Sequence, residues 1–227
     1  MTMKKITTVL MVFLLSLSIS SNAQDLIITA VYDGPLSGGV PKGVELYVLN
    51  DIADMSIYGL GSANNGGGSD GEEFTFPAVA YMAGTFIYVA SESSGFNTFF
   101  GFNPDYTTGA MAINGDDAIE LFMNGSVVDI FGDINVDGNG EPWEYLDGWA
   151  YRVDATGPDG SIFVLGNFTY SGPNALDDET SNATATTPVP IGTYMPPPPP
   201  VPLGTTGIII AIFLISAVLI VRRGRLI

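Results

Sequence analysis

The strongest constraint on the fold of this chain is a series of short apolar runs separated by turn-forming residues. Runs such as VELYVL (44–49), TFIYVA (85–90) and AIELFM (118–123) are rich in β-branched and aromatic residues, whereas Gly, Asn, Asp and Pro lie between the runs. Helical periodicity is nearly absent, and only residues 91–102 fit a short helical turn. The pattern predicts an all-β fold of two packed sheets, a β-sandwich. The predicted strands are 26–31, 44–49, 73–76, 85–90, 118–123, 127–131, 149–153 and 161–165.

One hairpin is predicted from a single dipeptide. Asn124-Gly125 separates the runs 118–123 and 127–131. Both central residues of a type I′ turn need positive φ, and Asn-Gly adopts that conformation at little cost. We therefore expect these two runs to pair as antiparallel neighbours.

The two ends of the chain predict an exported protein. Residues 1–23 combine two lysines, an apolar run at 9–17 and a final Ser-Asn-Ala, which together indicate a secretory signal peptide. Residues 203–221 form an apolar stretch about 28 Å long as a helix, and the basic tail 222–227 follows. Because basic residues stay cytoplasmic, we expect a transmembrane helix at 203–221 that leaves the folded part outside the cytoplasm. Residues 177–202, which are acidic, then Thr/Ala-rich, then Pro-rich, are expected to form a stalk.

The C-terminal tail resembles the bacterial sorting signals of the PEP and IPTL type. Those signals join a short Pro-containing motif to one membrane helix and a basic end. The matching motif here is PVPLG, residues 200–204. The resemblance implies an exosortase-like processing protease as a partner, which cuts near the motif and passes the protein to the cell surface.

Charge and composition narrow the function of the folded region, residues 24–176. All 24 acidic residues of the chain lie between residues 24 and 202, against two basic residues, Lys42 and Arg152, so the formal net charge there is −22. Such a surface repels phosphate backbones, so nucleic acid is not an expected partner, but it attracts divalent cations. The chain has no Cys and no His, which excludes Ser-His-Asp and Cys-His hydrolase sites.

The order of several segments resembles the bacterial lamin-tail domain, an immunoglobulin-like β-sandwich. The segments are LIITAVYDG (26–34), KGVELYVLND (42–51), NGDDAIELFMNGSVVDIFG (114–132) and VDGNGEPWEYLDGWAYR (136–152). The resemblance covers residues 26–174. It implies a mostly non-catalytic domain that serves in adhesion or localisation at the cell surface.

Residues 133–144, DINVDGNGEPWE, match the ligand spacing of an EF-hand calcium loop. A predicted strand precedes this stretch and Pro142 lies near its end, so no helix is expected on either side. Two interpretations stay open: one calcium ion bound at a β-turn, or a turn with solvated carboxylates between two strands. The candidate calcium ligands are Asp133, Asn135, Asp137, Asn139, Glu141 and Glu144.

A few other side chains are candidates for binding or catalysis. Trp143 is a candidate sugar-binding platform and, like Trp149, also fits the core of a sandwich. Arg152 is expected to pair with a partly buried carboxylate. Asp116 and Asp117 are adjacent, so on a strand they would point to opposite faces, and we expect them to be turn residues rather than a catalytic pair.

Together these patterns predict a non-enzymatic exported surface module, with glycans or surface proteins as partners. The alternative is a calcium-dependent carbohydrate-binding module built on residues 133–144 and Trp143. A glycan hydrolase that uses two carboxylates is a third class, but no acid–base spacing in the sequence supports it.

Overall fold

The computed structural model describes residues 24–198, which form two β-sheets with short helices between the strands. The strands are β1 (Leu26–Leu36), β2 (Val40–Val48), β3 (Tyr58–Ala63), β4 (Phe74–Thr75), β5 (Phe86–Ala90), β6 (Tyr106–Thr107), β7 (Ala118–Met123), β8 (Ser126–Phe131), β9 (Trp149–Arg152) and β10 (Phe168–Tyr170). The helices are α2 (Ser94–Phe100) and the 3-10 turns η1 (Met55–Ile57), η2 (Asn64–Gly66), η3 (Gly109–Met111) and η4 (Leu165–Asn167).

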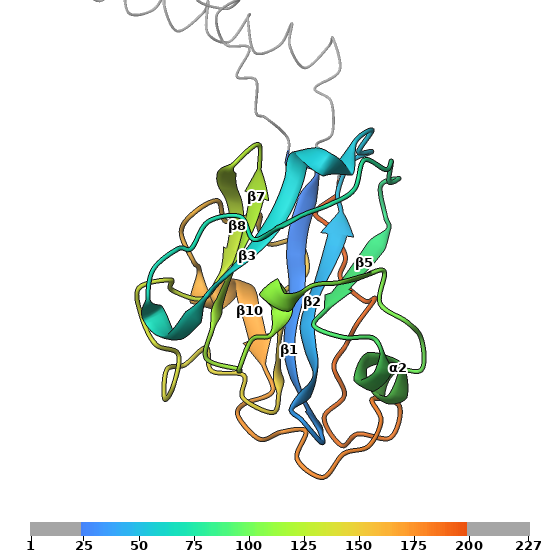
Figure 1. Ribbon diagram of the computed structural model, residues 1–227, viewed down its shortest axis with the longest axis vertical. Helices are drawn as coiled ribbons and strands as arrows, with labels where there is room; N and C mark the ends of the chain where they lie inside the picture. The colour runs from blue at the N-terminus through green and yellow to red at the C-terminus, as the bar shows by residue number, and fades with distance from the viewer. Residues whose placement is uncertain (1–23, 199–227) are drawn as a thin grey trace, which may run out of the picture. The chain divides into compact units, whose positions relative to one another are not determined.

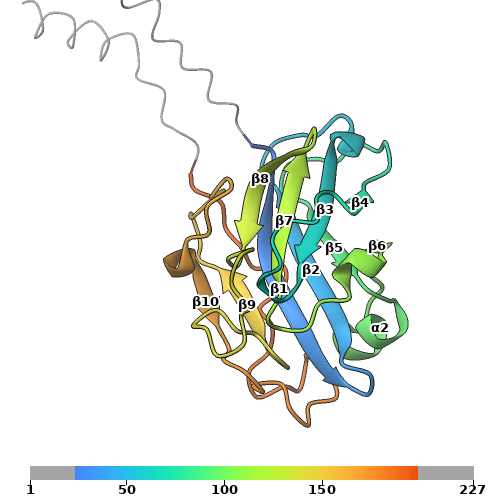
Figure 2. The ribbon, with the colours of Figure 1, turned by 60° about the vertical axis from the view of Figure 1, so that its left-hand side comes forward.

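The two sheets confirm the predicted β-sandwich. One sheet has the strand order β10-β9-β1-β2-β5-β6, and the other has the order β4-β3-β7-β8 (Figures 1 and 2). All pairs are antiparallel except β5 with β6, which are parallel. Figure 2 shows the two layers from a second side, with β3, β7 and β8 in front of β1 and β2.

The main hydrophobic core lies between the sheets. In β2, Val44, Leu46 and Val48 alternate with more polar residues, and all three side chains are fully buried. They meet Leu60 of β3 and Leu121 of β7 in the same cluster. Because successive side chains of a strand point to opposite faces, these three share the face toward the four-stranded sheet, whereas Glu45 and Tyr47 lie on the outer face.

A second hydrophobic cluster covers the outer face of the six-stranded sheet. Tyr32 of β1 packs there beside Phe96 of α2, with ring centroids 6.2 Å apart, and Ile27 of β1 belongs to the same cluster. The C-terminal segment 171–196, drawn in orange in Figure 1, adds Val189 and Tyr194, which are 2% and 3% exposed. We expected a stalk at 177–202, but this part of it packs on the sheet. The folded unit therefore continues to Pro196 instead of ending at residue 176.

The two predicted targeting segments lie outside the described residues. These are the signal peptide at 1–23 and the apolar stretch with its basic tail at 203–227. Between residues 24 and 198, none of the helices has the length and apolar character needed to cross a bilayer.

Candidate functional site

The loop that carries the predicted calcium ligands joins β8 to β9 and is built from successive turns. Asp133 Oδ1 accepts a hydrogen bond of 2.9 Å from the backbone N–H of Asn135, and Asp137 Oδ1 accepts one of 3.0 Å from Asn139. Glu144 Oε2 accepts a third, of 2.9 Å, from the N–H of Gly140. Three of the six candidate carboxylates and amides thus hold the backbone of their own loop, as Asx residues commonly do in turns.

The structure does not gather these six residues around one point. Asn135, Asn139 and Glu141 are exposed at the surface of the loop. Residues 24–198 contain no group of three or more acidic side chains close enough together to hold a metal ion. Strands flank the loop on both sides, so the helix–loop–helix frame of an EF-hand is missing here. Calcium binding stays a prediction.

The structure assigns Trp143 to the interior rather than to a sugar-binding surface. Its side chain is 4% exposed, and its ring meets Phe131 and Phe163 edge to face, with centroids 6.0 and 6.2 Å apart. Gly138 lies against the same indole, since a Cβ added there would be 2.6 Å from Cη2 of Trp143. The loop is therefore wrapped around its own tryptophan, which leaves no ring face for a ligand. Trp149 is also buried, but in the cluster on the outer face of the six-stranded sheet rather than between the two sheets.

Asp116 and Asp117 lie beside this loop and have different environments. Asp117 is fully buried, and its two oxygens accept the backbone N–H groups of Asn65 and Asn114. Asp116 Oδ1 is buried without a hydrogen-bond partner. Burial, and then the negative charges of Asp117, Asp137 and Glu144, raise the pKa of Asp116. Two of the predicted calcium ligands are thus near a carboxylate oxygen that lacks a partner.

The glycine-rich stretch 64–73 closes the other side of the loop. Gly66, at φ +69°, packs against the backbone of Val136 and Asp137, and the N–H of Gly68 donates to the carbonyl of Ile134 at 2.8 Å. The same stretch lies on the outer face of the four-stranded sheet, where Ser69 donates to the buried Glu120. Its glycines allow close packing between backbones.

A cavity of about 250 Å³ opens between the start of the candidate loop and residues 161–163. Asp133, Asn135 and Ser161 give it polar groups, and Phe163 is half-buried at its wall. Ile162, at its rim, is 73% exposed. Asp133 is the one titratable residue among those that line this cavity.

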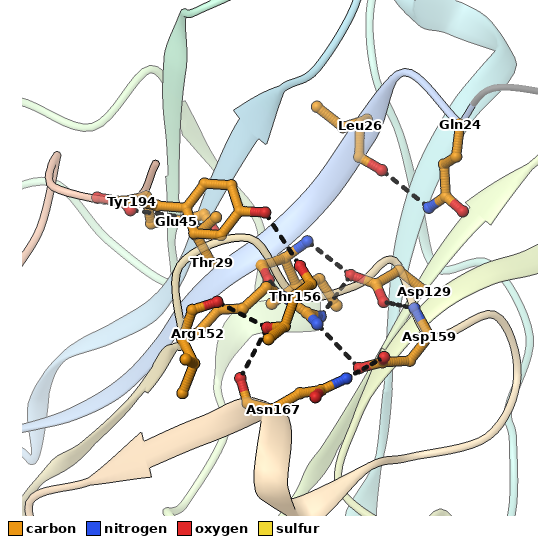
Figure 3. Close-up of polar contacts among 12 residues, drawn as sticks. Gln24, Leu26, Thr29, Glu45, Asp129, Arg152, Thr156, Asp159, Asn167 and Tyr194 are labelled. Carbon is orange, nitrogen blue, oxygen red and sulfur yellow. Dashed lines mark hydrogen bonds and ion pairs between the residues drawn. The ribbon is translucent and has the colours of Figure 1, made fainter. Parts of the chain in front are cut away.

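Figure 3 shows a buried polar network around Arg152 that fixes β9 to its neighbours. The guanidinium donates to Asp129 of β8 and to Asp159, each at 2.8 Å, and to the carbonyl of Ile28 in β1. Asn167 completes the network by donating to Asp159. The predicted pairing of Arg152 with a partly buried carboxylate is confirmed by Asp159, and the second partner, Asp129, is fully buried.

Glu45 forms a second buried polar centre, which sequence reasoning missed. Its side chain is fully buried and accepts hydrogen bonds from Thr29 (2.7 Å), Tyr151 (3.0 Å) and the N–H of Gly192 (2.6 Å). Tyr151 in turn accepts the N–H groups of two further residues of the C-terminal segment, Thr193 and Tyr194. Burial raises the pKa of Glu45 to about 7, although these hydrogen bonds oppose the rise. An acidic residue at an outward position of a strand was the only signal in the sequence.

Comparison with known proteins gives no assignment. No family model matches the chain, and neither a curated protein nor a solved structure is similar to it.

Proposed function

We propose that the protein is a non-catalytic module exported to the cell surface, where it serves adhesion, matrix contact or localisation. An immunoglobulin-like, lamin-tail-related sandwich and a C-terminal sorting signal are parts of this proposal. The observation that carries this proposal is that the buried charged residues have structural roles. Arg152 and Asp129 hold strands together, and Glu45 holds the C-terminal segment in place. Hydrolysis of glycans needs two carboxylates that flank one bond, whereas Asp133 is the one carboxylate among the residues that line this cavity.

The acidic surface supports the same proposal. Lys42 forms an ion pair of 2.8 Å with Asp33, and Arg152 is 1% exposed. The positive charges of both basic residues of the folded region are therefore neutralised by carboxylates of the same domain. The outside of the domain is therefore strongly anionic, which keeps a protein soluble outside the cell and disfavours contact with phosphate polymers.

The proposal is tested in the host cell with the full-length chain. Antibodies raised against the protein should label intact cells, and deletion of the gene should lower attachment to glycan-coated or protein-coated surfaces. Reintroduced full-length protein should restore attachment, whereas a chain that ends at residue 202 should be released into the medium. Labelling that requires permeabilised cells, or attachment that is unchanged by the deletion, would reject the proposal.

A calcium-dependent carbohydrate-binding module is the second candidate. The observation that favours it is the partnerless oxygen of Asp116, whose pKa is raised by burial and by the negative charges of Asp117, Asp137 and Glu144, although among residues 24–198 these carboxylates are not gathered as a ready-made metal site. The cavity at the start of the candidate loop, lined in part by Asp133, Asn135 and Phe163, offers polar groups and an aromatic wall that suit a sugar ring. In this candidate the cavity, with Phe163 as its aromatic residue, is the sugar-binding surface in place of Trp143, which is buried.

Thermal unfolding of the full-length chain in detergent, with excess calcium and with excess chelator, tests this second candidate. A site filled at about 100 times its Kd would stabilise the fold by about 2.7 kcal/mol. The Asp137→Asn variant should lose the response, whereas Asp178→Asn, an exposed change elsewhere, should keep it. Equal midpoints with calcium and chelator would remove calcium from consideration, and a glycan array would then test the cavity alone.

A further inference from the structure

Lys42, Asp33 and Asn114 form a compact group of one amine, one carboxylate and one amide. Lys42 Nζ lies 2.8 Å from Oδ1 of Asp33 and 3.1 Å from Oδ1 of Asn114. A carbonyl C=O bond is ~1.2 Å long, so Cγ of Asn114 lies no more than about 4.3 Å from Nζ. An amine, a carboxyl group and an amide carbon are thus within reach of one another.

The backbones that carry these three side chains are fixed. Asp33 and Lys42 are register partners in the β1–β2 pair. The N–H of Asn114 donates to the fully buried Asp117 at 2.9 Å, and the carbonyl of the next residue, Gly115, accepts the N–H of Tyr145 at 2.7 Å. Holding reactants in such a fixed arrangement turns a slow bimolecular reaction into an effectively unimolecular one.

The environment suits proton transfer at Asp33. The Asp33 side chain is 2% exposed and that of Lys42 is 14% exposed. Burial, opposed by Lys42, raises the pKa of Asp33 to about 6, which makes its carboxylate a better proton acceptor than a solvated one. Asp147 is the other carboxyl group that interacts with this pair. Asn114 is exposed on its outer side, which gives released ammonia a path to solvent.

We propose that Lys42 and Asn114 become joined by an isopeptide bond between Nζ and Cγ, with Asp33 as the proton acceptor. Asp33 first takes one proton from the Lys42 ammonium, and the freed lone pair of Nζ forms a bond to Cγ while the C=O π electrons move onto Oδ1. When these electrons return, the Cγ–Nδ2 bond breaks and its electron pair leaves on Nδ2. The departing nitrogen takes one proton from Nζ and one from Asp33. The products are a secondary amide and one ammonium ion, and Asp33 is again a carboxylate.

Such a bond would tie the two sheets together. Lys42 belongs to β2 of the six-stranded sheet, and Asn114 lies just before β7 of the four-stranded sheet. The link would close a loop between residues 72 positions apart, in a chain that has no cysteine to form a disulfide. A cross-link over a loop of this length restricts the unfolded chain strongly, by the same physics as a disulfide.

Peptide mapping tests the bond directly. The purified full-length chain is denatured, digested with chymotrypsin and analysed by tandem mass spectrometry. We expect one branched peptide that contains both Lys42 and Asn114 and lacks the mass of one ammonia. Recovery of both residues only in linear peptides of unaltered mass would overturn the proposal.

Matched variants separate this bond from other losses of ammonia. Asn114-Gly115 can also lose ammonia by forming a succinimide, which does not need Lys42. The Lys42→Arg variant keeps the positive charge beside Asp33 but lacks the amine that would form the bond. It should therefore lose no ammonia, and without the cross-link it should migrate more slowly on a denaturing gel than the wild type. A loss of ammonia that persists in Lys42→Arg would overturn the proposal, and so would cross-linking that persists in Asp33→Asn.

Discussion

Arg152 shows how far single residues can be interpreted from the sequence. As the one arginine between residues 24 and 202, it is predicted to pair with a partly buried carboxylate, and it pairs with the partly buried Asp159 and the fully buried Asp129. Its partners Asp129 and Asp159 could not be identified from the sequence. Asp129 points inward because β8 pairs it with Leu121, and this register depends on the whole sheet.

The Arg152 network should be expensive to break. Replacing Arg152 with Leu removes the counter-charge from two carboxylates that are nearly inaccessible to solvent and leaves the carbonyl of Ile28 without that donor. We expect the free energy of unfolding to fall by about 3–5 kcal/mol, because uncompensated buried charges are strongly destabilising. Urea unfolding of the variant measures this loss, with Asp178→Asn as the surface control. A loss below about 1 kcal/mol would mean that the network contributes little.

Glu45 carries the clearest pH dependence of any single residue. Burial raises its pKa from 4.5 to about 7 in the folded state, so folding favours the protonated form. The stability that this residue contributes is fully present below pH 4.5 and is lost as pH rises to about 7. A shift of this size corresponds to about 3 kcal/mol.

The Glu45→Gln variant should remove that loss, because Gln stays neutral. At pH 8 we expect its free energy of unfolding to exceed that of the wild type by about 1–3 kcal/mol, with little difference at pH 4. Urea unfolding at a series of pH values measures the effect, and Glu141→Gln, an exposed change, should follow the wild type. A variant that is less stable than the wild type at pH 8 would show that the hydrogen bonds to the carboxylate outweigh its desolvation.

At the scale of elements, the strands with regular alternation were predicted well and the irregular ones were not. The hairpin at Asn124-Gly125 is confirmed, with φ values of +50° and +74°, and so is the short helix within 91–102. The strand β3, YGLGSA, was missed because two glycines weaken its propensity. Those glycines are needed, since a Cβ at Gly61 would lie 2.2 Å from the carbonyl oxygen of Gly71.

One more element was predicted wrongly for reasons of tertiary context, and the loop 133–144 keeps both of its predicted interpretations. The predicted strand at 161–165 is wrong: these residues form an exposed loop and the start of η4, and β10 begins at Phe168 instead. In the loop 133–144, Asx turns and glycines satisfy the same pattern as calcium coordination, because both need short oxygen-bearing side chains and sharp turns. A pattern alone does not separate the two roles.

Residues 177–202 are predicted as a stalk because their composition is polar and rich in Thr and Pro, but most of them belong to the packed C-terminal segment 171–196. This segment has little regular secondary structure after β10, so side chains satisfy its backbone instead: Glu45 and Tyr151 bind its N–H groups at 192–194. Those partners lie more than 40 residues away in the chain, which is why a local reading could not find them.

Tyr194 tests whether this segment is part of the fold. It is 3% exposed, packs edge to face on Tyr47 and donates to the carbonyl of Thr156 at 3.0 Å. Tyr194→Ala should lower the free energy of unfolding by about 3 kcal/mol and open the segment to proteases, since truncating a large buried side chain leaves a cavity. The neighbouring Met195, 62% exposed, gives the control Met195→Ala, which should change stability by less than about 0.5 kcal/mol. Equal behaviour of the two variants would favour a detached stalk.

At the scale of the whole molecule, charge is the dominant long-range effect. The folded region has 24 acidic residues against two basic ones, and both basic residues are paired inside it. Like charges repel one another more strongly in a compact state than in an extended chain, so the net charge lowers stability. Burial of single carboxylates lowers stability further when they are ionised, since burial raises the pKa of Asp33 to about 6 and that of Glu45 to about 7.

Salt and mild acid should therefore both stabilise the protein. Salt screens repulsion between exposed charges, with a Debye length of about 8 Å at 0.15 M, and affects the buried Arg152 network much less. Lowering the pH from 8 to 5 protonates Asp33 and Glu45 in the folded state, which binds protons more tightly than the unfolded state at these sites, so the free energy of unfolding should rise. Thermal unfolding of the full-length chain across a grid of NaCl concentration and pH measures both effects. Glu45→Gln is the internal control, because it should keep the whole response to salt and lose part of the response to pH. A midpoint that falls with added salt would mean that attractive ion pairs, rather than the excess of carboxylates, govern the electrostatics of this fold.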